Sequence, residues 1–175
     1  MTKTAKREKV VDFSKPYYTV ENVMLVQKKD ADKYNKISDK KGKQIGAQQS
    51  TTQEDIIKKQ MKGANLVTES VTTSLATELK NGKIDLVAQN YASCAAVVMK
   101  NPDDYEIVAD DSGKAEMVGT DTWVSWAVRK EDTELSDYID SEIHKFKEDG
   151  TLAELQKKWF GEAVDLPESD YIPAE

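Results

Sequence analysis

The chain has 175 residues, of which 38% are hydrophobic and 33% are charged, and its formal net charge is −7. Charges of both signs are mixed along it, which excludes a disordered chain and a basic nucleic-acid-binding surface, so no nucleic acid is expected as a partner. Its only cysteine, Cys94, excludes an intramolecular disulfide. One histidine and one thiol leave no nucleophile dyad and no thiolate–imidazole metal site, so we expect neither catalysis nor a cofactor.

The first predicted elements are strands at residues 10–13, 23–27 and 43–49, where short apolar or β-branched runs are bounded by turn residues. A helix is expected to begin directly after Thr51, because Thr51 and Glu54 have the spacing of a capping box. The following segments continue the alternation of strand and helix. They are a strand at 65–68, a helix at 73–80, a strand at 84–88, a helix at 90–99, and strands at 105–109 and 123–128. This order predicts an α/β fold with a largely parallel sheet flanked by helices.

The last third of the sequence predicts two helices, at 134–148 and 151–159, separated by an Asp-Gly pair. The first of them carries an apolar stripe that needs a core to cover. Trp159 and Phe160 are interpreted as core anchors of the final helix. We expect residues 164–175 to be a loosely attached surface segment.

The most informative stretch is TKTAKREKVVDFSKPYY, residues 2–18, in which Thr4 can cap a helical turn that presents Arg7. Physical grounds alone favour a solvated surface arginine. The stretch, however, resembles the T-x-x-R-x-x-x-V-x-F-S-x-P-Y-Y motif of the extracellular solute-binding proteins for polar amino acids. In that family the arginine pairs bidentately with the α-carboxylate of the ligand and a hydroxyl residue five positions earlier bonds the ligand. The resemblance implies these roles for Arg7 and Thr2, and a planar guanidinium suits a carboxylate.

A second stretch, GKQIGAQQSTTQE at residues 42–54, is similar to the G-K-x-I-G-x-x-x-G-[ST]-[ST]-x-E strand, loop and helix of the same family. The start of a helix favours an anion by about 0.3 to 1 kcal/mol, or up to ~2 kcal/mol when partly buried. Ser50, Thr51 and Thr52 would add hydroxyl donors to the carboxylate site. An ordinary N-cap cluster is the alternative. Ser50 stands where the family usually has glycine, which places a side chain where the ligand should approach.

A third stretch, LKNGKIDLVAQN at residues 79–90, resembles L-x-x-G-x-[IV]-D-A-V-x-x-D, whose final aspartate commonly binds the α-ammonium of the ligand. Here that position is Asn90, which supplies no charge, and loss of a buried charge partner costs ~2 to 5 kcal/mol. Either a carboxylate elsewhere compensates, or the ligand is not a standard α-amino acid. An N-cap role for Asn90 is compatible with ligand contact. Gln48 and Gln89 are further expected ligand contacts and favour polar groups.

Residues 126–132 and 146–161 also resemble the closing segments of the family, so the resemblance covers nearly the whole chain. It implies a truncated, periplasmic-binding-protein-like fold of two lobes. Residues 1–18 would be a remnant of the first lobe with the first hinge, 19–121 the second lobe, and 122–175 the second hinge with the C-terminal helices of the first lobe. The opening elements of the family would precede Met1. We therefore expect unpartnered apolar faces on 123–128 and the last two helices. Strand exchange in a homodimer or another form of dimerisation would cover them, and deliberate truncation of the chain is the alternative explanation.

The resemblance implies that the protein is the substrate-binding component of an amino-acid ABC importer, closes two lobes around a polar amino acid and is then recognised by the membrane permease. It implies an extracellular or periplasmic location and a lipoprotein anchor in the full-length precursor. A sensor or receptor domain of the same fold is an alternative, and a dehydratase-like enzyme is a weaker one, because no matched position supplies an acid. Basic, acidic and amide amino acids, cystine and small zwitterionic osmolytes all stay open as ligands.

Overall fold

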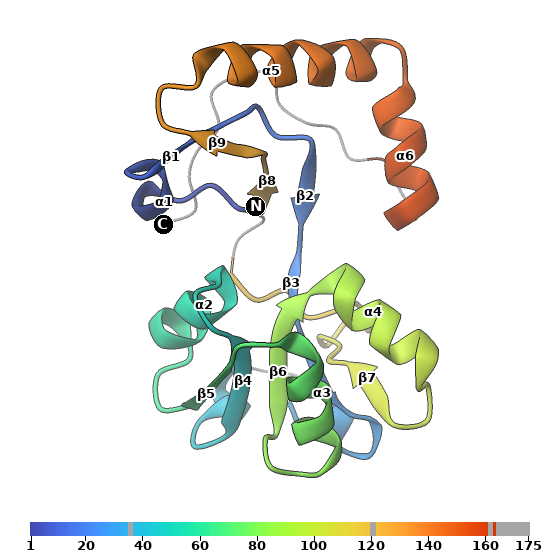
Figure 1. The fold of residues 1–175 in the computed structure, drawn as a ribbon. Coiled ribbons are helices and arrows are strands. Elements are labelled where there is room, and N and C mark those ends of the chain that lie inside the picture. Colours follow the sequence, from blue (N-terminus) through green and yellow to red (C-terminus); the bar gives the residue numbers. More distant parts are fainter. Residues whose placement is uncertain (35–36, 120–121, 161–162, 164–175) are drawn as a thin grey trace. The chain divides into compact units, whose positions relative to one another are not determined.

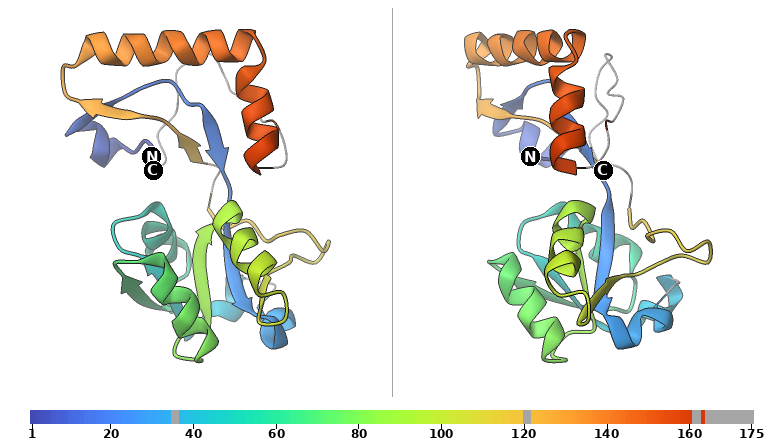
Figure 2. Two further views of the ribbon diagram at one scale, coloured as in Figure 1. Left: turned by 45° about the vertical axis from the view of Figure 1, so that its right-hand side comes forward. Right: turned by 90° about the vertical axis from the view of Figure 1, so that its right-hand side faces the viewer.

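A computed structural model describes residues 1–34, 37–119, 122–160 and 163. The chain divides into two compact units (Figures 1 and 2): Met1–Val20 with Asp121–Glu175 form the first, and Glu21–Thr120 form the second. The second unit is thus inserted into the sequence of the first. The boundaries expected after residues 18 and 121 fall within two residues of these passages. That the units are the two lobes of a clamshell stays a prediction.

The second unit is built on a five-stranded sheet of order β5-β4-β6-β3-β7. Its strands β4, β5 and β6 are mutually parallel, whereas β3 runs antiparallel to both β6 and β7. The sheet is therefore mixed, although all its strands except β3 share one direction. Strand β3 brings the chain into this unit, so no helical crossover from another strand of the sheet precedes it. It is therefore not required to run parallel to its neighbours. The strands are β3 (Asn22–Gln27), β4 (Gln44–Gln48), β5 (Asn65–Glu69), β6 (Leu86–Asn90) and β7 (Tyr105–Ile107).

Helices cover both faces of this sheet, which explains why β3 is a continuous apolar run. Alternate residues of β3 point to opposite faces. Met24 and Val26 pack in the cluster that contains α2, and Val23 and Leu25 pack in the cluster that contains α3 and α4. The helices are α2 (Thr52–Gln60), α3 (Thr72–Lys80) and α4 (Tyr91–Lys100), with short 3₁₀ segments η1 (Lys28–Lys33) and η2 (Ile37–Lys40). The predicted α/β architecture of sheet and flanking helices is confirmed.

The first unit holds two separate antiparallel ladders, β1 with β9 and β2 with β8. Strand β2 occupies part of the expected hinge, and the strand expected at 123–128 is divided into β8 and β9. The division falls at residues 125–126, where the Ser14 hydroxyl accepts from the Trp126 N–H and the Ser14 N–H donates to the Trp126 carbonyl, both at 3.0 Å. The elements are α1 (Ala5–Glu8), β1 (Val11–Phe13), β2 (Tyr18–Val20), β8 (Thr122–Val124), β9 (Ala127–Arg129), α5 (Thr133–Glu148) and α6 (Thr151–Phe160).

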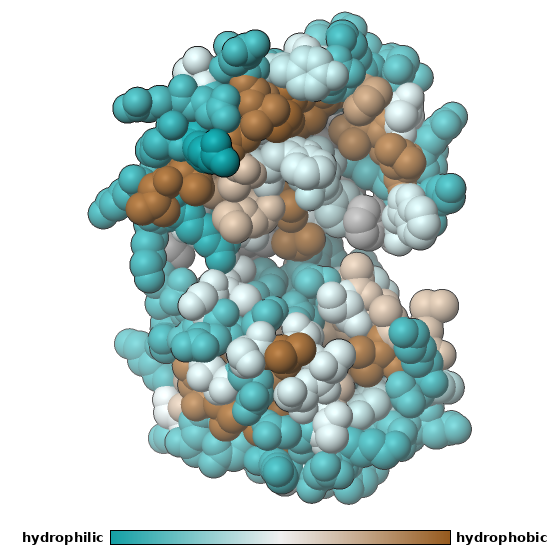
Figure 3. All heavy atoms as spheres, viewed as in Figure 1, coloured by the Kyte–Doolittle hydropathy of each residue, from teal (hydrophilic) through white to brown (hydrophobic). Residues whose placement is uncertain are grey.

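Large apolar side chains are exposed on the first unit, and Figure 3 shows apolar atoms on the face that carries α5 and α6. Within 123–128 Trp126 is exposed whereas Val128 is buried, and that these faces have no partner stays a prediction. The interpretation of Trp159 as a core anchor is wrong, because 69% of this residue is exposed. The Phe160 side chain and residues 164–175 lie outside the described part of the chain. The exposed residues include Trp126, Leu135, Tyr138, Phe146, Leu155 and Trp159. No helix in the described ranges has the length and apolar character needed to cross a bilayer.

Candidate functional site

The start of α2 carries the predicted hydroxyl cluster of Ser50, Thr51 and Thr52. Thr51 is the N-cap, and its hydroxyl accepts a hydrogen bond from the Glu54 N–H at 3.4 Å, as the capping box predicts. The same hydroxyl donates to the carbonyl of Gln48 at 2.6 Å, so Thr51 is committed to the turn. Thr52 is half-buried in the first helical turn, whose N–H groups have no partners inside the helix. These groups and the helix dipole favour an anion here.

Ser50 adopts a backbone conformation that glycine favours, with φ 63°. The resemblance places glycine at this position, so the loop keeps the geometry expected for glycine although the residue is serine. The Ser50 N–H donates to Oε2 of Glu54 at 2.7 Å. The other carboxylate oxygen of Glu54 lies 2.5 Å from Nζ of Lys58, which balances the negative charge beside the helix start.

Asn90 ends β6 and caps α4. Its Oδ1 accepts from the Ser93 N–H at 2.9 Å, and its Nδ2 donates to Oε1 of Gln89 at 3.0 Å. The N-cap interpretation of Asn90 is therefore confirmed, and both ends of its amide are already used within the unit. A ligand ammonium that contacts Asn90 would have to share Oδ1 with the Ser93 N–H. Such sharing is chemically possible because an amide oxygen has two lone pairs.

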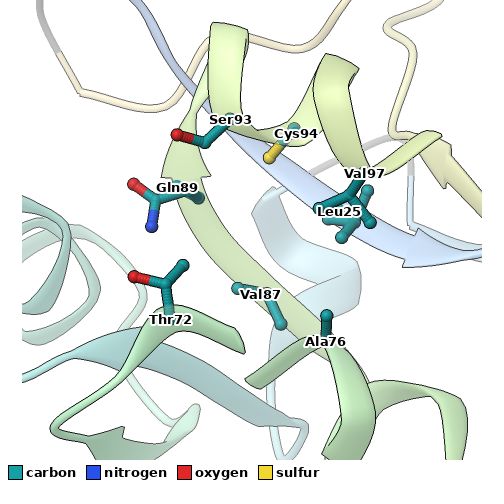
Figure 4. A pocket seen from close by; sticks show the side chains of 8 residues that line it. All are labelled: Leu25, Thr72, Ala76, Val87, Gln89, Ser93, Cys94 and Val97. Atoms are coloured by element: carbon teal, nitrogen blue, oxygen red, sulfur yellow. The ribbon is translucent and has the colours of Figure 1, made fainter. Parts of the chain in front are cut away.

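Gln48 and Gln89 lie on the sheet face that α3 covers, rather than beside α2. Gln48 tethers the start of α3, donating to the Ser70 carbonyl and accepting from the Thr72 hydroxyl, both at 3.2 Å. Gln89 lines a pocket of about 40 Å³ (Figure 4), with its amide near the hydroxyls of Thr72 and Ser93. The structure thus gives both glutamines local partners.

Cys94 forms part of the apolar wall of the same pocket, together with side chains from β3, β6, α3 and α4. Burial raises the pKa of its thiol to about 12, because the thiolate would lose its hydration. The thiol therefore stays protonated at neutral pH and is a poor nucleophile.

Asn22 and Gln53 form a buried amide pair that the sequence did not reveal. Nε2 of Gln53, in the first turn of α2, donates to Oδ1 of Asn22 at 2.7 Å. Asn22 also stands opposite Asn90 in the β3–β6 ladder, so it joins the start of α2 to the end of β6. The only signal in the sequence was a polar residue at the head of an apolar strand. The pairing partner, 31 positions away, could not be predicted.

Thr2 and Arg7 lie together in the first unit, and their contact with a ligand stays a prediction. Nη1 of Arg7 donates to the backbone carbonyl of Thr2 at 2.8 Å, and Thr2 is buried and bridged to Val124. Thr4 is the N-cap of α1 and accepts from the Arg7 N–H at 3.2 Å, which confirms the predicted capped turn. This bond to Thr2 fixes the direction of a guanidinium that has five donors in total.

The predicted site residues therefore fall in both units, Thr2 and Arg7 in the first and the others in the second. The first unit supplies an oriented guanidinium, and the second supplies the helix start that carries Ser50 and Thr52. These are groups that bind carboxylates. Within the described ranges no group of three or more His, Cys, Asp or Glu residues is placed to hold a metal ion.

The model of the bacterial extracellular solute-binding proteins, family 3, matches residues 1–162. The arginine-binding extracellular protein ArtP of Bacillus subtilis is 34% identical over 168 residues, covering 91% of this chain and 60% of that protein. The chain thus spans about three fifths of the length of such curated relatives.

Solved structures agree with the family match. The substrate-binding protein AbpA of Streptococcus pneumoniae, bound to L-arginine, has a TM-score of 0.81 and 33% identity, covering 92% of this chain and 65% of that one. The ancestral amino-acid-binding protein AncCDT-1, a precursor of cyclohexadienyl dehydratase, has a TM-score of 0.78 and 30% identity, with coverages of 91% and 65%. The chain belongs to the bacterial extracellular solute-binding proteins of family 3.

Proposed function

We propose that the chain is part of the substrate-binding component of an amino-acid ABC importer and that it binds the α-carboxylate of a polar amino acid. The observation that carries the proposal is the start of α2, where Thr52 lies in a helical turn behind a loop that keeps the backbone conformation of glycine. Preorganised donors of this kind bind an anion without paying to reorganise. Family membership supports the same assignment.

Arg7 would provide the charged partner of the ligand carboxylate. Its position in a capped turn and its bond to Thr2 restrict the guanidinium before a ligand arrives. Lysine could not reproduce a bidentate contact, because an ammonium is a point charge. Loss of a buried charge partner of this kind costs about 2 to 5 kcal/mol, or roughly thirtyfold to several-thousandfold in affinity.

L-Arginine is the first ligand to test. One relative at 34% identity is named as arginine-binding, and a solved structure at 33% identity holds L-arginine. Asn90 supplies no negative charge for an ammonium, and its amide already bonds Ser93 and Gln89. Recognition would therefore rest on the carboxylate contacts more heavily than in relatives that carry an aspartate there.

The rest of the assignment follows the family. The protein would act outside the cytoplasmic membrane, be held there by a lipid anchor on its precursor, and deliver its ligand to a membrane permease. It would be a binding protein and not an enzyme, as membership of a family of solute-binding proteins favours. The similarity to AncCDT-1 makes dehydratase activity the alternative to assay.

Isothermal titration calorimetry with L-arginine tests the proposal. Arg7→Ala and Arg7→Lys should each weaken binding at least thirtyfold, whereas Arg129→Ala, a matched exposed arginine of the first unit, should leave the Kd within twofold. The proposal fails if no standard amino acid binds to the wild-type chain, or if Arg7→Ala binds as the wild type does.

A strand-exchanged homodimer would cover the exposed face of α5 and α6, and the exposure of Leu135 and Trp159 is the observation in its favour. Light scattering after size exclusion decides this point. A monomer at every concentration would remove the dimer while leaving the binding proposal intact.

A further inference from the structure

Asn22 links three parts of the second unit. Its side chain accepts from Gln53 in the first turn of α2, and its backbone stands opposite Asn90, the N-cap of α4. Its carbonyl accepts from the Val118 N–H at 2.8 Å. Asn22 is fully buried, so these contacts are shielded from competing water.

The amide of Asn22 is only partly satisfied. Its Oδ1 is bonded to Gln53, whereas its Nδ2 is buried without a partner among the described residues. A buried donor without an acceptor is destabilising, and an apolar side chain of similar shape would avoid that cost. Stability alone therefore gives no reason for an asparagine here. The bond to Gln53 is what an apolar residue would lose.

The location of Asn22 suggests what this bond does. Asn22 follows Glu21, the first residue of the second unit, and Val118 lies two residues before Thr120, the last one. The returning segment also runs closely against α2: a Cβ added to Gly119 would lie 2.7 Å from Cδ1 of Ile56. Asn22 thus connects the entering strand β3, the returning segment at Val118 and the start of α2.

We propose that Asn22 is a positioning residue, which through Gln53 fixes the anion-binding start of α2 to the two segments by which the chain enters and leaves the second unit. This inference rests on the proposed function. An anion that orders the first turn of α2 also orders both segments, because Asn22 and Val118 are bonded to each other. The Asn22–Gln53 pair then increases the affinity for the anion without increasing the free energy of unfolding.

The double variant Asn22→Leu with Gln53→Leu separates these two effects, since it leaves neither amide with a lost partner. We expect a Tm equal to or above that of the wild type and an affinity for L-arginine at least tenfold lower. The control is Gln27→Leu, at the opposite end of β3, where Nε2 donates to the Leu79 carbonyl at 2.7 Å. It should lower the Tm and leave the Kd within twofold.

Hydrogen exchange on the wild-type chain gives a second readout that needs no variant. Addition of L-arginine should protect the amides of Gln53 and Val118 together, and leave unchanged that of Lys28, which donates to the Asp104 carbonyl beyond the other end of β3. Absence of binding by the wild type would remove the proposed function and this inference with it. Three outcomes would overturn this inference alone. The first is that the double variant binds L-arginine as tightly as the wild type, and the second is that the double variant does not fold. The third is that L-arginine binds but leaves the exchange of the Val118 amide unchanged.

Discussion

The two units of the molecule differ in how far their apolar residues are buried. Among the described residues, every buried hydrophobic side chain except Val128 and Ile143 belongs to the second unit, where two clusters fill both faces of one sheet. The first unit instead exposes large residues such as Trp126 and Tyr138. We therefore expect the second unit to fold by itself, and the first to need further apolar contacts for its stability.

Separating the units is the strongest way to test this contrast. A polypeptide of residues 21–120 should fold cooperatively, while the segments of the first unit without it should stay largely unfolded. Cys94 reports the outcome, because burial raises the pKa of its thiol to about 12 and unfolding returns it to the ordinary range near 8.5. A disulfide reagent at pH 8 should label native protein slowly and unfolded protein fast. Fast labelling of the isolated unit without denaturant would contradict its autonomy.

A buried ion pair offers the next largest effect. Lys40 is fully buried, and its Nζ lies 2.5 Å from Oε2 of Glu116 and 3.1 Å from the Tyr34 carbonyl. Lys40→Met should lower the free energy of unfolding by about 3–5 kcal/mol, because it leaves the Glu116 charge buried and unpaired. The control Lys80→Met breaks an exposed pair with Asp104 and should cost roughly 0–1 kcal/mol. If urea unfolding gave equal losses of unfolding free energy for the two variants, burial of the ion pair would not determine the cost of breaking it.

A leucine from each unit compares their packing directly. Leu75 is fully buried against the sheet, and Leu75→Ala should cost about 2–5 kcal/mol. Leu135 on α5 is 44% exposed, so Leu135→Ala should change the free energy of unfolding by about 0.5 kcal/mol or less. A large loss at Leu135 would indicate that something already covers α5 in solution.

The smallest effect is expected at the loop before α2. Ser50→Gly should stabilise the chain by about 0.5–1 kcal/mol, because relief from a left-handed conformation outweighs the extra backbone entropy of glycine when unfolded. Ser50→Ala removes the hydroxyl but keeps the strain, so it separates the two causes and should give no gain. Thermal unfolding monitored by circular dichroism compares the three chains.

Local features of the fold could be predicted from the sequence, and non-local ones could not. The capping box of Thr51 and Glu54 and the N-cap role of Asn90 follow from residues only a few positions apart, and both were confirmed. The reversed direction of β3 depends on pairing with β6 and β7, far along the chain. The error at Trp159 has the same origin, since an apolar helical face does not specify what covers it.

Around the candidate site, the capped turn that presents Arg7 was predictable because Thr4 and Arg7 are only three residues apart. The placement of Gln48 and Gln89 was not, since strand alternation directs them toward α3 and only the register of the sheet decides that face. Asn22 was missed for the same reason as β3, because its partners are distant in sequence.

The bond between Asn22 and Val118 also bears on chain entropy. In the unfolded chain, joining β1 to β9 means closing a loop of roughly 120 residues, since Val11 pairs with Arg129. Once the second unit has folded, that bond holds the two ends of the insertion together, and only about 20 residues remain to be closed. Loop-closure entropy then costs roughly 1.5 kcal/mol less. The inserted unit thus works as a reversible cross-link, and melting it should also destabilise the β1–β9 ladder of the first unit.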